Sequence, residues 1–271
     1  RSLNCLQWSS DGQGLLFLMT DPETDGERCR REKREDGIEF EQNPKYTRLY
    51  RMDVRSGETV CLSLQGLQIW EFAPAPSGRQ FVAVCSPLPF EQSWYTCHLI
   101  TFSESQTEPI VLFSGPRQVS SPAWSPDGKL VAFLASNWSD RGVVGGGIFV
   151  VPPGGGTLHE LASNREASFT WVEWLKDSQG LIAASHTWGE MALSEVRLEP
   201  GSHRHLWRGP AMLTEANWPR FSRNSLGSVA VVRQDAQHSR QVWLGSPSGD
   251  GLEWNQLTNF NRQAKELTLG S

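Results

Sequence analysis

The chain has 271 residues, a formal net charge of −5, and 12 Trp, 12 Phe, 25 Gly and 16 Pro. Because the chain is acidic overall and has no basic stripe, its charge argues against nucleic acid as a partner. No apolar run approaches the about 20 residues that cross a bilayer, and no signal-like stretch is present, so we expect no membrane partner.

One phrase recurs along the chain: an apolar stretch with an aromatic residue, a polar turn, and a second apolar stretch. The clearest copy is Trp124-Ser-Pro-Asp-Gly128, and the five copies place the aromatic residue at Trp8, Phe72, Trp124, Trp174 and Phe221. Proline, Asp and Gly in this order favour a tight turn, so each copy predicts a β-hairpin. Intervals of 47 to 64 residues are typical of repeat arrays.

A second pair of strands follows each hairpin. It is clearest at residues 48–62, 147–161 and 241–257 and looser at 95–113 and 191–207. Four antiparallel strands in about 50 residues are the signature of a β-propeller blade. We therefore predict an all-β fold, a β-propeller of four-stranded antiparallel blades with about five blades, that is, a partial propeller. No amphipathic helix of useful length is predicted, and the tryptophans are interpreted as core residues.

The repeats divide the chain into a propeller domain, residues 1–260, and a remaining C-terminal segment, residues 261–271. Within the propeller we place the five repeats at residues 1–64, 65–115, 116–165, 166–210 and 211–260. In a blade, the connections after the second and fourth strands lie on one face. The insertions after second strands, at Thr20–Tyr46, Asn137–Gly146 and His186–Glu190, should gather there, and we expect substrate or partner contacts on that face.

The search for catalytic and metal-binding motifs finds none that is complete. A serine hydrolase of the α/β type needs Gly-x-Ser-x-Gly, and the nearest string, residues 245–249, has Pro247 at its centre. His203 and His205 are two residues apart on one face of a strand, but no third ligand is near. We therefore predict no catalytic residue in this chain, no metal and no cofactor.

Five cysteines fall in the first hundred residues, with no Cys-x-x-Cys pair. Free thiols in a reducing compartment are the favoured interpretation, which indicates a cytoplasmic protein. A disulfide between Cys85 and Cys97, across two strands of the second repeat, stays open as the alternative.

Three segments resemble the propellers of the prolyl oligopeptidase family of serine peptidases, particularly its acylaminoacyl-peptidase and dipeptidyl-peptidase-like members. They are residues 34–60, which carry an inserted loop before a third strand, the blade opening at residues 119–129, and the tail at 256–270. The resemblance implies a non-catalytic lid that gates and helps bind short peptides for a C-terminal α/β-hydrolase domain in cis. Family propellers usually have seven or eight blades and this chain lacks the catalytic triad, so we interpret it as a fragment.

By position only, the resemblance makes the charged insertion the place where a peptide terminus is held. The candidate substrate-binding residues are Arg31, Arg34, Glu35 and Asp36. The alternative for these residues is an ordinary solvated loop.

Two other functions compete with the peptidase propeller. A stand-alone propeller could act as a protein-interaction scaffold, although the Gly-His and Trp-Asp dipeptides of WD repeats are missing. A propeller glycosidase or lyase would need several inward carboxylates. We also expect an open arc with an unpaired blade edge on its N-terminal side, which would associate with itself into a homo-oligomer.

Overall fold

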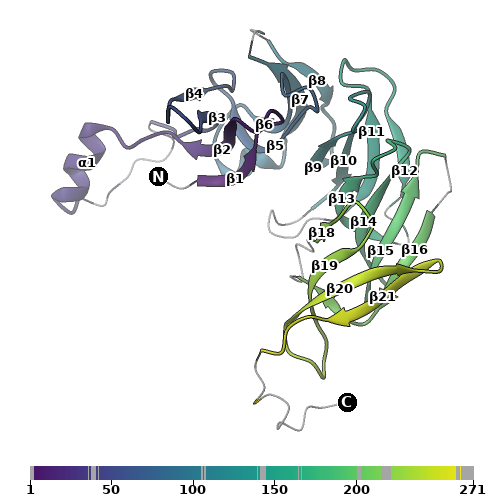
Figure 1. Cartoon of the computed structure of the whole chain (residues 1–271). Coiled ribbons are helices and arrows are strands. Elements are labelled where there is room, and N and C mark those ends of the chain that lie inside the picture. The colour runs from purple at the N-terminus through teal and green to yellow at the C-terminus, as the bar shows by residue number, and fades with distance from the viewer. Residues whose placement is uncertain are drawn as a thin grey trace. The chain divides into compact units, whose positions relative to one another are not determined.

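The computed structural model describes residues 3–35, 37, 41, 43–104, 106, 108–138, 140, 145–163, 165, 167–199, 203–214, 221–260 and 263. In these residues the chain folds into five antiparallel sheets with two short helices (Figure 1). The sheets confirm the predicted all-β propeller-type fold. Neither described helix is long or apolar enough to cross a membrane.

Each sheet, called a blade from here on, takes its strands in chain order. Blade 1 has β1 (Leu3–Trp8), β2 (Gly14–Thr20), β3 (Thr47–Asp53) and β4 (Thr59–Cys61), and blade 2 has β5 (Gln68–Pro74), β6 (Gln80–Ser86), β7 (His98–Ser103) and β8 (Ile110–Phe113). Blade 3 has β9 (Gln118–Trp124), β10 (Val131–Ser136), β11 (Gly147–Val151) and β12 (His159–Ala162). Blade 4 has β13 (Ser168–Trp174), β14 (Gly180–Thr187), β15 (Glu190–Arg197) and β16 (His203–Gly209). Blade 5 has β17 (Met212–Leu213) and β18 (Ser222–Arg223), which both pair with β19 (Val229–Gln234), then β20 (Gln241–Ser248) and β21 (Gly251–Gln256).

The first hairpins of blades 1 to 4 close with the same turn, and the turn of blade 5, from Asn224 to Ser228, is one residue shorter. In every blade the residue three positions after the start of the turn has a positive φ: Gly12, Gly78, Gly128, Ser178 and Gly227. In blade 3 the Gly128 N–H donates to the Ser125 carbonyl at 2.9 Å, and the Ser125 N–H donates to the Leu130 carbonyl at 2.8 Å. The Asp127 carboxylate accepts from the Ser125 hydroxyl and the Lys129 N–H, which explains the Ser-Pro-Asp-Gly sequence.

Aligned on these turns, the aromatic residues fall into two positions. Trp8, Trp124 and Trp174 stand directly before the turn, whereas Phe72 and Phe221 stand two residues farther from it. Two residues along a strand return to the same face, so both positions project to the same side of a blade. Trp124, Trp174 and Phe72 are buried there.

The chain forms two compact units, residues 1–124 with 152–156, and residues 125–151 with 157–271. In the first unit, one face of blade 1 packs on blade 2, with Leu16, Leu18 and Leu49 against Ile69 and Phe81. In the second unit, blades 4 and 5 share an apolar core built around Leu193, Leu213 and Val231 with several tryptophans at its margin.

Arg233 of β19 is set among the tryptophans at that margin. Its guanidinium carbon lies 4.9 Å from the ring centre of Trp243, 5.4 Å from that of Trp207 and 5.8 Å from that of Trp254. Aromatic faces attract a cation, so the three rings hold this side chain between blades 4 and 5.

Three sequence-based expectations need correction. The insertion after β2 contains a helix, α1 (Asp25–Glu32), where none was predicted. The segment His186–Glu190 is no insertion, because β14 and β15 are joined by the two-residue turn Trp188-Gly189, both with positive φ, as a type I′ hairpin requires. Trp8 and Trp188 are not core residues: their exposed fractions are 61% and 82%.

Candidate functional site

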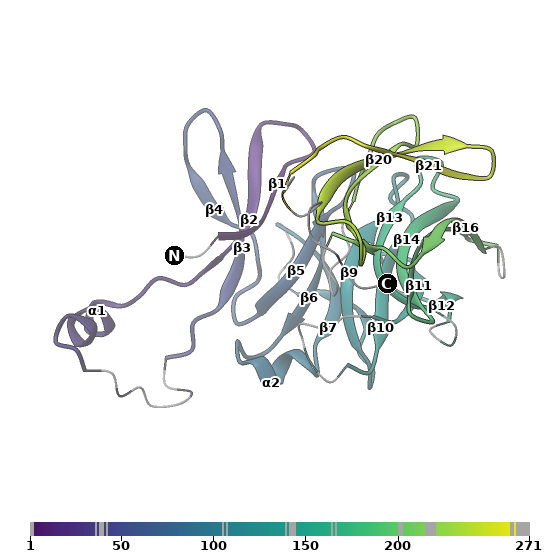
Figure 2. The ribbon, with the colours of Figure 1, turned by 90° about the horizontal axis from the view of Figure 1, so that it is seen from below.

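The insertion between β2 and β3 forms a capped helix that stands away from the strands of blade 1 (Figures 1 and 2). Thr24 caps α1: its hydroxyl accepts from the Glu27 N–H at 3.3 Å, and the Glu27 carboxylate accepts from the Thr24 N–H at 2.6 Å. This Thr-x-x-Glu capping box was the sequence signal for the helix. Lys45 lies 2.6 Å from Glu27, and this ammonium, with the Thr24 donors, lowers the pKa of Glu27 to about 2.

Both ends of the insertion are fixed to the sheet. Asp21 pairs with Arg48 of β3 at 2.8 Å and accepts from the Tyr46 N–H at 3.1 Å, while the Asp21 N–H donates to the Tyr46 carbonyl. The Tyr46 hydroxyl donates to the Pro87 carbonyl of blade 2 at 3.2 Å. The base of the insertion is therefore anchored, whereas no residue of α1 itself is buried.

The predicted site residues lie at the far end of this insertion. Arg31, in the last turn of α1, is held by Glu23 through two hydrogen bonds of 3.0 and 3.1 Å, and Glu23 raises its pKa. Arg34 and Glu35 follow the helix at exposed positions, with no ion pair to another described residue. Asp36 lies outside the described residues. The structure thus brings three of the four candidates to one exposed helix end, away from the hollow described next.

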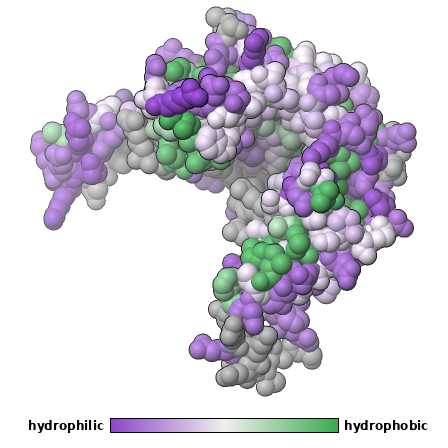
Figure 3. Space-filling model, viewed as in Figure 1, coloured by the Kyte–Doolittle hydropathy of each residue, from purple (hydrophilic) through white to green (hydrophobic). Residues whose placement is uncertain are grey.

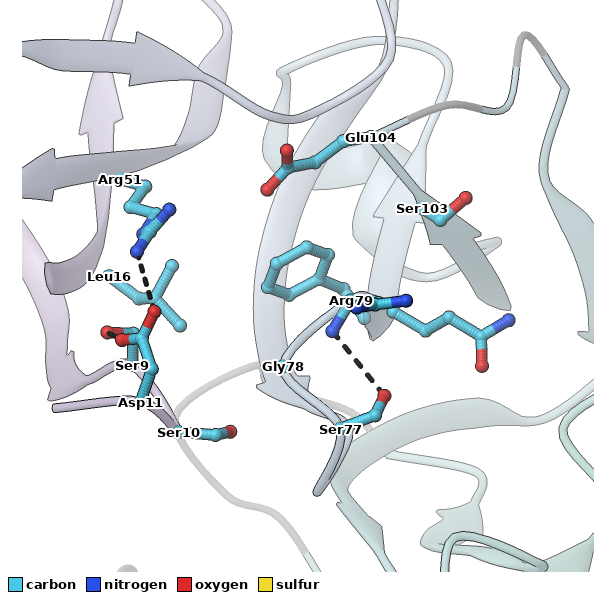
Figure 4. Close-up of a pocket in the computed structure, with 12 residues that line it drawn as sticks. Ser9, Ser10, Asp11, Leu16, Arg51, Ser77, Gly78, Arg79, Ser103 and Glu104 are labelled. Carbon is cyan, nitrogen blue, oxygen red and sulfur yellow. Dashed lines mark hydrogen bonds and ion pairs between the residues drawn. The ribbon is translucent and has the colours of Figure 1, made fainter. Parts of the chain in front are cut away.

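A hollow lies elsewhere, between blades 1 and 2. It has a volume of about 820 Å³ and is lined by the first-hairpin turns of both blades and by the end of β7 (Figure 4). Its apolar floor includes Leu16 and Phe81, both buried, and the Ser10 hydroxyl closes one end by donating to the Ala75 carbonyl at 3.2 Å. Sequence reasoning missed this hollow because its walls come from turns that are far apart in the chain.

The walls of this hollow carry charges of both signs. Arg51 and Asp11 pair at 2.9 Å on the blade 1 side, and the Ser9 hydroxyl, the Gln13 N–H and Arg51 hold the pKa of Asp11 below its ordinary value. Arg79 and Glu104 line the blade 2 side, and neither has an ion pair with a described residue. Figure 4 shows the Glu104 carboxylate directed into the hollow. The hollow offers hydrogen-bonding and charged groups, and the contact of the Ser9 hydroxyl with Asp11 in its wall belongs to the hairpin turn.

The histidine pair and the cysteines take ordinary structural places. The rings of His203 and His205 lie 4.7 Å apart on one face of β16, and His205 Nδ1 is 2.9 Å from the Ser194 hydroxyl. The described residues contain no group of three side chains that could hold a metal ion. All five cysteines are free thiols, as expected; Cys85 and Cys97 are buried, and burial raises their pKa values to about 12 and about 11.

Comparison with known proteins finds similarity in structure but not in sequence. No protein-family profile matches the sequence, and no curated protein matches it. An acylaminoacyl peptidase from Pyrococcus horikoshii matches 98% of this chain and 39% of its own, with a TM-score of 0.65 and 13% identity. A dipeptidyl peptidase 4 from Porphyromonas gingivalis matches 96% of this chain and 40% of its own, with a TM-score of 0.60 and 10% identity.

An enzyme of another class matches equally well. An oligogalacturonate lyase from Vibrio parahaemolyticus matches 94% of this chain with a TM-score of 0.64 and 13% identity. This chain spans 64% of that lyase's length. At these identities the comparisons show the fold alone: blades of the type found in peptidases of the prolyl oligopeptidase family and in other propeller proteins.

Proposed function

We propose that this chain is the non-catalytic propeller domain of a serine peptidase and that it gates and helps to bind short peptide substrates. In this proposal an α/β-hydrolase domain of the same polypeptide supplies the nucleophile, since this chain has no Gly-x-Ser-x-Gly elbow. The free thiols favour a reducing compartment, so we propose the cytoplasm as its location.

The extent of the acylaminoacyl-peptidase match carries the proposal. That match takes in 98% of this chain and 39% of the peptidase. A domain of a larger enzyme is expected to align in this way, over nearly its whole length and over less than half of its relative. The lyase match, by comparison, covers 64% of the lyase.

The α1 segment supports the substrate-binding part of the proposal. It holds Arg31, Arg34 and Glu35 at exposed positions on an insertion whose base is fixed by the Asp21–Arg48 pair. A guanidinium opposite a peptide carboxylate, or a carboxylate opposite a peptide ammonium, makes a charge-assisted hydrogen bond. Such contacts would select among peptide termini.

The test uses the native protein that contains this sequence. An antibody raised against the chain isolates the protein from its source, and the isolate is treated with a fluorophosphonate, which labels activated serines. The proposal expects a labelled polypeptide well above 30.3 kDa, and it expects the chain alone to stay unlabelled. An unlabelled native protein would overturn the proposal and would leave the stand-alone interaction scaffold as the better interpretation.

A further inference from the structure

The hollow between blades 1 and 2 continues into a second one. The first, of about 820 Å³, and the second, of about 440 Å³, are both lined by Arg51 and Glu104, so they meet at these two residues. We call the two hollows together the turn groove. Its walls belong to consecutive blades that share one apolar core. Both volumes fall in the range of about 300–1,000 Å³ that is typical of small-molecule sites.

The turn groove is separate from the α1 insertion. β2 begins at the first-hairpin turn that lines the groove and ends at Thr20, where the insertion starts, and β3 returns from the insertion to Asp53 in the second hollow. Strands of this length span about 20 Å, so the groove and the insertion lie at opposite ends of blade 1. Figure 3 shows mostly hydrophilic side chains over α1, and none of them is buried. The groove, in contrast, has an apolar floor of Leu16 and Phe81 that can cover the apolar part of a ligand.

Two charged side chains of the turn groove have no counter-ion among the residues that the structure describes. Asp11 accepts hydrogen bonds from the Ser9 hydroxyl, the Gln13 N–H and Arg51, so Asp11 and Arg51 neutralise each other. Arg79 and Glu104 line the same hollow without an ion pair. Figure 4 shows Arg51 and Glu104 on opposite walls of the hollow. The groove therefore offers a ligand one guanidinium and one carboxylate.

The distribution of charge gives the turn groove a direction. The second hollow has three acidic residues and one basic residue: Asp53, Glu58, Glu104 and Arg51. Arg79 lines only the first hollow, which is therefore the end where an anionic group is favoured. A cationic group is favoured where the hollows meet, at Glu104, and beyond it Val60, which is 51% exposed, adds apolar surface.

We propose that the turn groove binds a short zwitterionic peptide. The peptide carboxylate pairs with Arg79, an apolar side chain covers the floor of Leu16 and Phe81, and the peptide ammonium pairs with Glu104. Both terminal contacts are charge-assisted hydrogen bonds. A ligand with a single charge would leave either Arg79 or Glu104 unpaired, whereas a zwitterion matches both. The site is distinct from α1 and requires no hydrolase domain, so it stands independently of the function proposed above.

Blocking one end of the ligand at a time tests the proposal. The chain is titrated at low ionic strength, by isothermal titration calorimetry, with the tripeptide Ala-Leu-Ala, with its N-acetylated and its C-amidated forms, and with free leucine. The unmodified tripeptide should bind most tightly, and either block should weaken binding by about fivefold, the effect of losing one partly exposed ion pair. Free leucine has both charges on one carbon atom and cannot reach both walls, so it should bind more weakly than the tripeptide.

Variants of the two free charges assign each end of the peptide to its wall. Arg79→Gln should weaken the unmodified and N-acetylated peptides by about fivefold and leave the C-amidated peptide unchanged, because that peptide has no carboxylate to lose. Glu104→Gln should weaken the unmodified and C-amidated peptides and leave the N-acetylated peptide unchanged. Both side chains are exposed, so both variants should fold, which circular dichroism checks.

Matched controls lie outside the turn groove. Lys129 follows Gly128 in the turn of blade 3 as Arg79 follows Gly78 in blade 2, and Glu108 is an exposed acid that follows Glu104 in the chain. Lys129→Gln and Glu108→Gln should leave all affinities unchanged.

Three results would overturn the proposal: no binding of the unmodified tripeptide up to millimolar concentration, free leucine binding as tightly as the tripeptide, or a variant that weakens every form of the peptide alike. The double variant Arg31→Ala, Arg34→Ala separates the groove from α1. If this variant alone lost binding, the peptide would be held at α1, which would support the function proposed above and contradict a site in the turn groove.

Discussion

The first hairpins of blades 1 and 4 have nearly the same backbone and opposite environments. In both, the turn is closed by hydrogen bonds between equivalent residues: the Ser9 N–H donates to the Gly14 carbonyl, and the Leu175 N–H donates to the Gly180 carbonyl, each at 2.9 Å. Both first strands contain a bulge, between Asn4 and Gln7 in β1 and between Phe169 and Trp171 in β13. Yet Trp8 is 61% exposed and Trp174 is 5% exposed.

The difference separates what the local sequence determines from what a neighbouring blade determines. The turn and the bulge depend on residues within the hairpin, so they form alike in both blades. Burial of the tryptophan depends on a sheet packed beside the strand: β13 lies next to β10 and β11 of blade 3, and this contact covers its face. The same phrase therefore gives a core residue in one blade and a surface residue in the other.

Replacing the tryptophan of each hairpin by alanine should give the largest difference between the two hairpins in the free energy of unfolding. Trp174→Ala deletes a buried ring and should lower the free energy of unfolding by about 3–5 kcal/mol. Trp8→Ala removes an exposed ring and should change it by about 0.5 kcal/mol or less. Urea unfolding of dilute protein, followed by circular dichroism, measures both. Similar losses for the two variants would contradict the assigned environments.

Substitutions in the turn should, by contrast, lower the free energy of unfolding by the same amount in an exposed and a buried hairpin. Gly12 and Gly128 have φ values of +67° and +72°, and a Cβ at either position meets no atom within 4 Å. Gly12→Ala and Gly128→Ala should therefore each cost about 1–2 kcal/mol, from the left-handed backbone alone. The two variants are compared by urea unfolding, with Gly154→Ala as the control, since Gly154 is equally open and has no positive φ. A loss of unfolding free energy in only one of the two variants would contradict the claim that the two turns are equivalent.

Acid should weaken both turns over the same pH range. The Ser9 and Ser125 hydroxyls, each two residues before the acid, are the main cause of the lowered pKa values of Asp11 and Asp127. The ordinary pKa of an Asp carboxyl is 3.8. A carboxyl whose pKa is lowered in the folded state stabilises the fold at pH values above 3.8. This contribution is lost as the pH falls below 3.8 and passes through the folded-state pKa. Carbon-detected NMR titration measures both pKa values. Ser125→Ala should move that of Asp127 upward and leave Asp11 unchanged; no shift at Asp127 would contradict the hydroxyl as the cause.

The smallest effect on stability is expected at α1, where no side chain is buried. Replacing Arg31 and Arg34 by Ala should change the free energy of unfolding by about 0.5 kcal/mol or less. If the proposed function holds, the same change in the native enzyme should alter its preference among acetylated, free and C-terminally amidated peptides. Lys129→Ala, in the exposed turn of blade 3, is the control. If the ratios of kcat/KM among these peptides do not change, α1 is a solvated insertion without a role in substrate binding.

Local sequence signals predicted the hairpins well and the environment of single residues poorly. The Trp-Ser-Pro-Asp-Gly phrase identified the turns, since Asp127 and Gly128 act within a few residues of the chain. The exposure of Trp8 was not predictable, because burial of the aromatic residue depends on a neighbouring sheet rather than on the phrase. The helix α1 was missed although its capping box is present, since an eight-residue charged segment has no apolar periodicity.

The candidate site was predictable only in part. The charge cluster correctly indicated an exposed insertion, and Arg31, Arg34 and Glu35 lie together at its end. The hollow between blades 1 and 2 required the fold, since Asp11, Arg79 and Glu104 come from three different turns. Reasoning along a chain finds groups that are neighbours in sequence, whereas this hollow is made of groups that only the sheet packing brings together.

Hydroxyl-radical footprinting of the dilute chain tests the central claim most directly, because it reports side-chain exposure at each copy of the repeated phrase. The account predicts fast oxidation of Trp8 and Leu6 and slow oxidation of Trp124, Trp174 and Phe72, in line with their exposed fractions. Equal oxidation of Trp8 and Trp174 would contradict a repeat whose first copy has an open face.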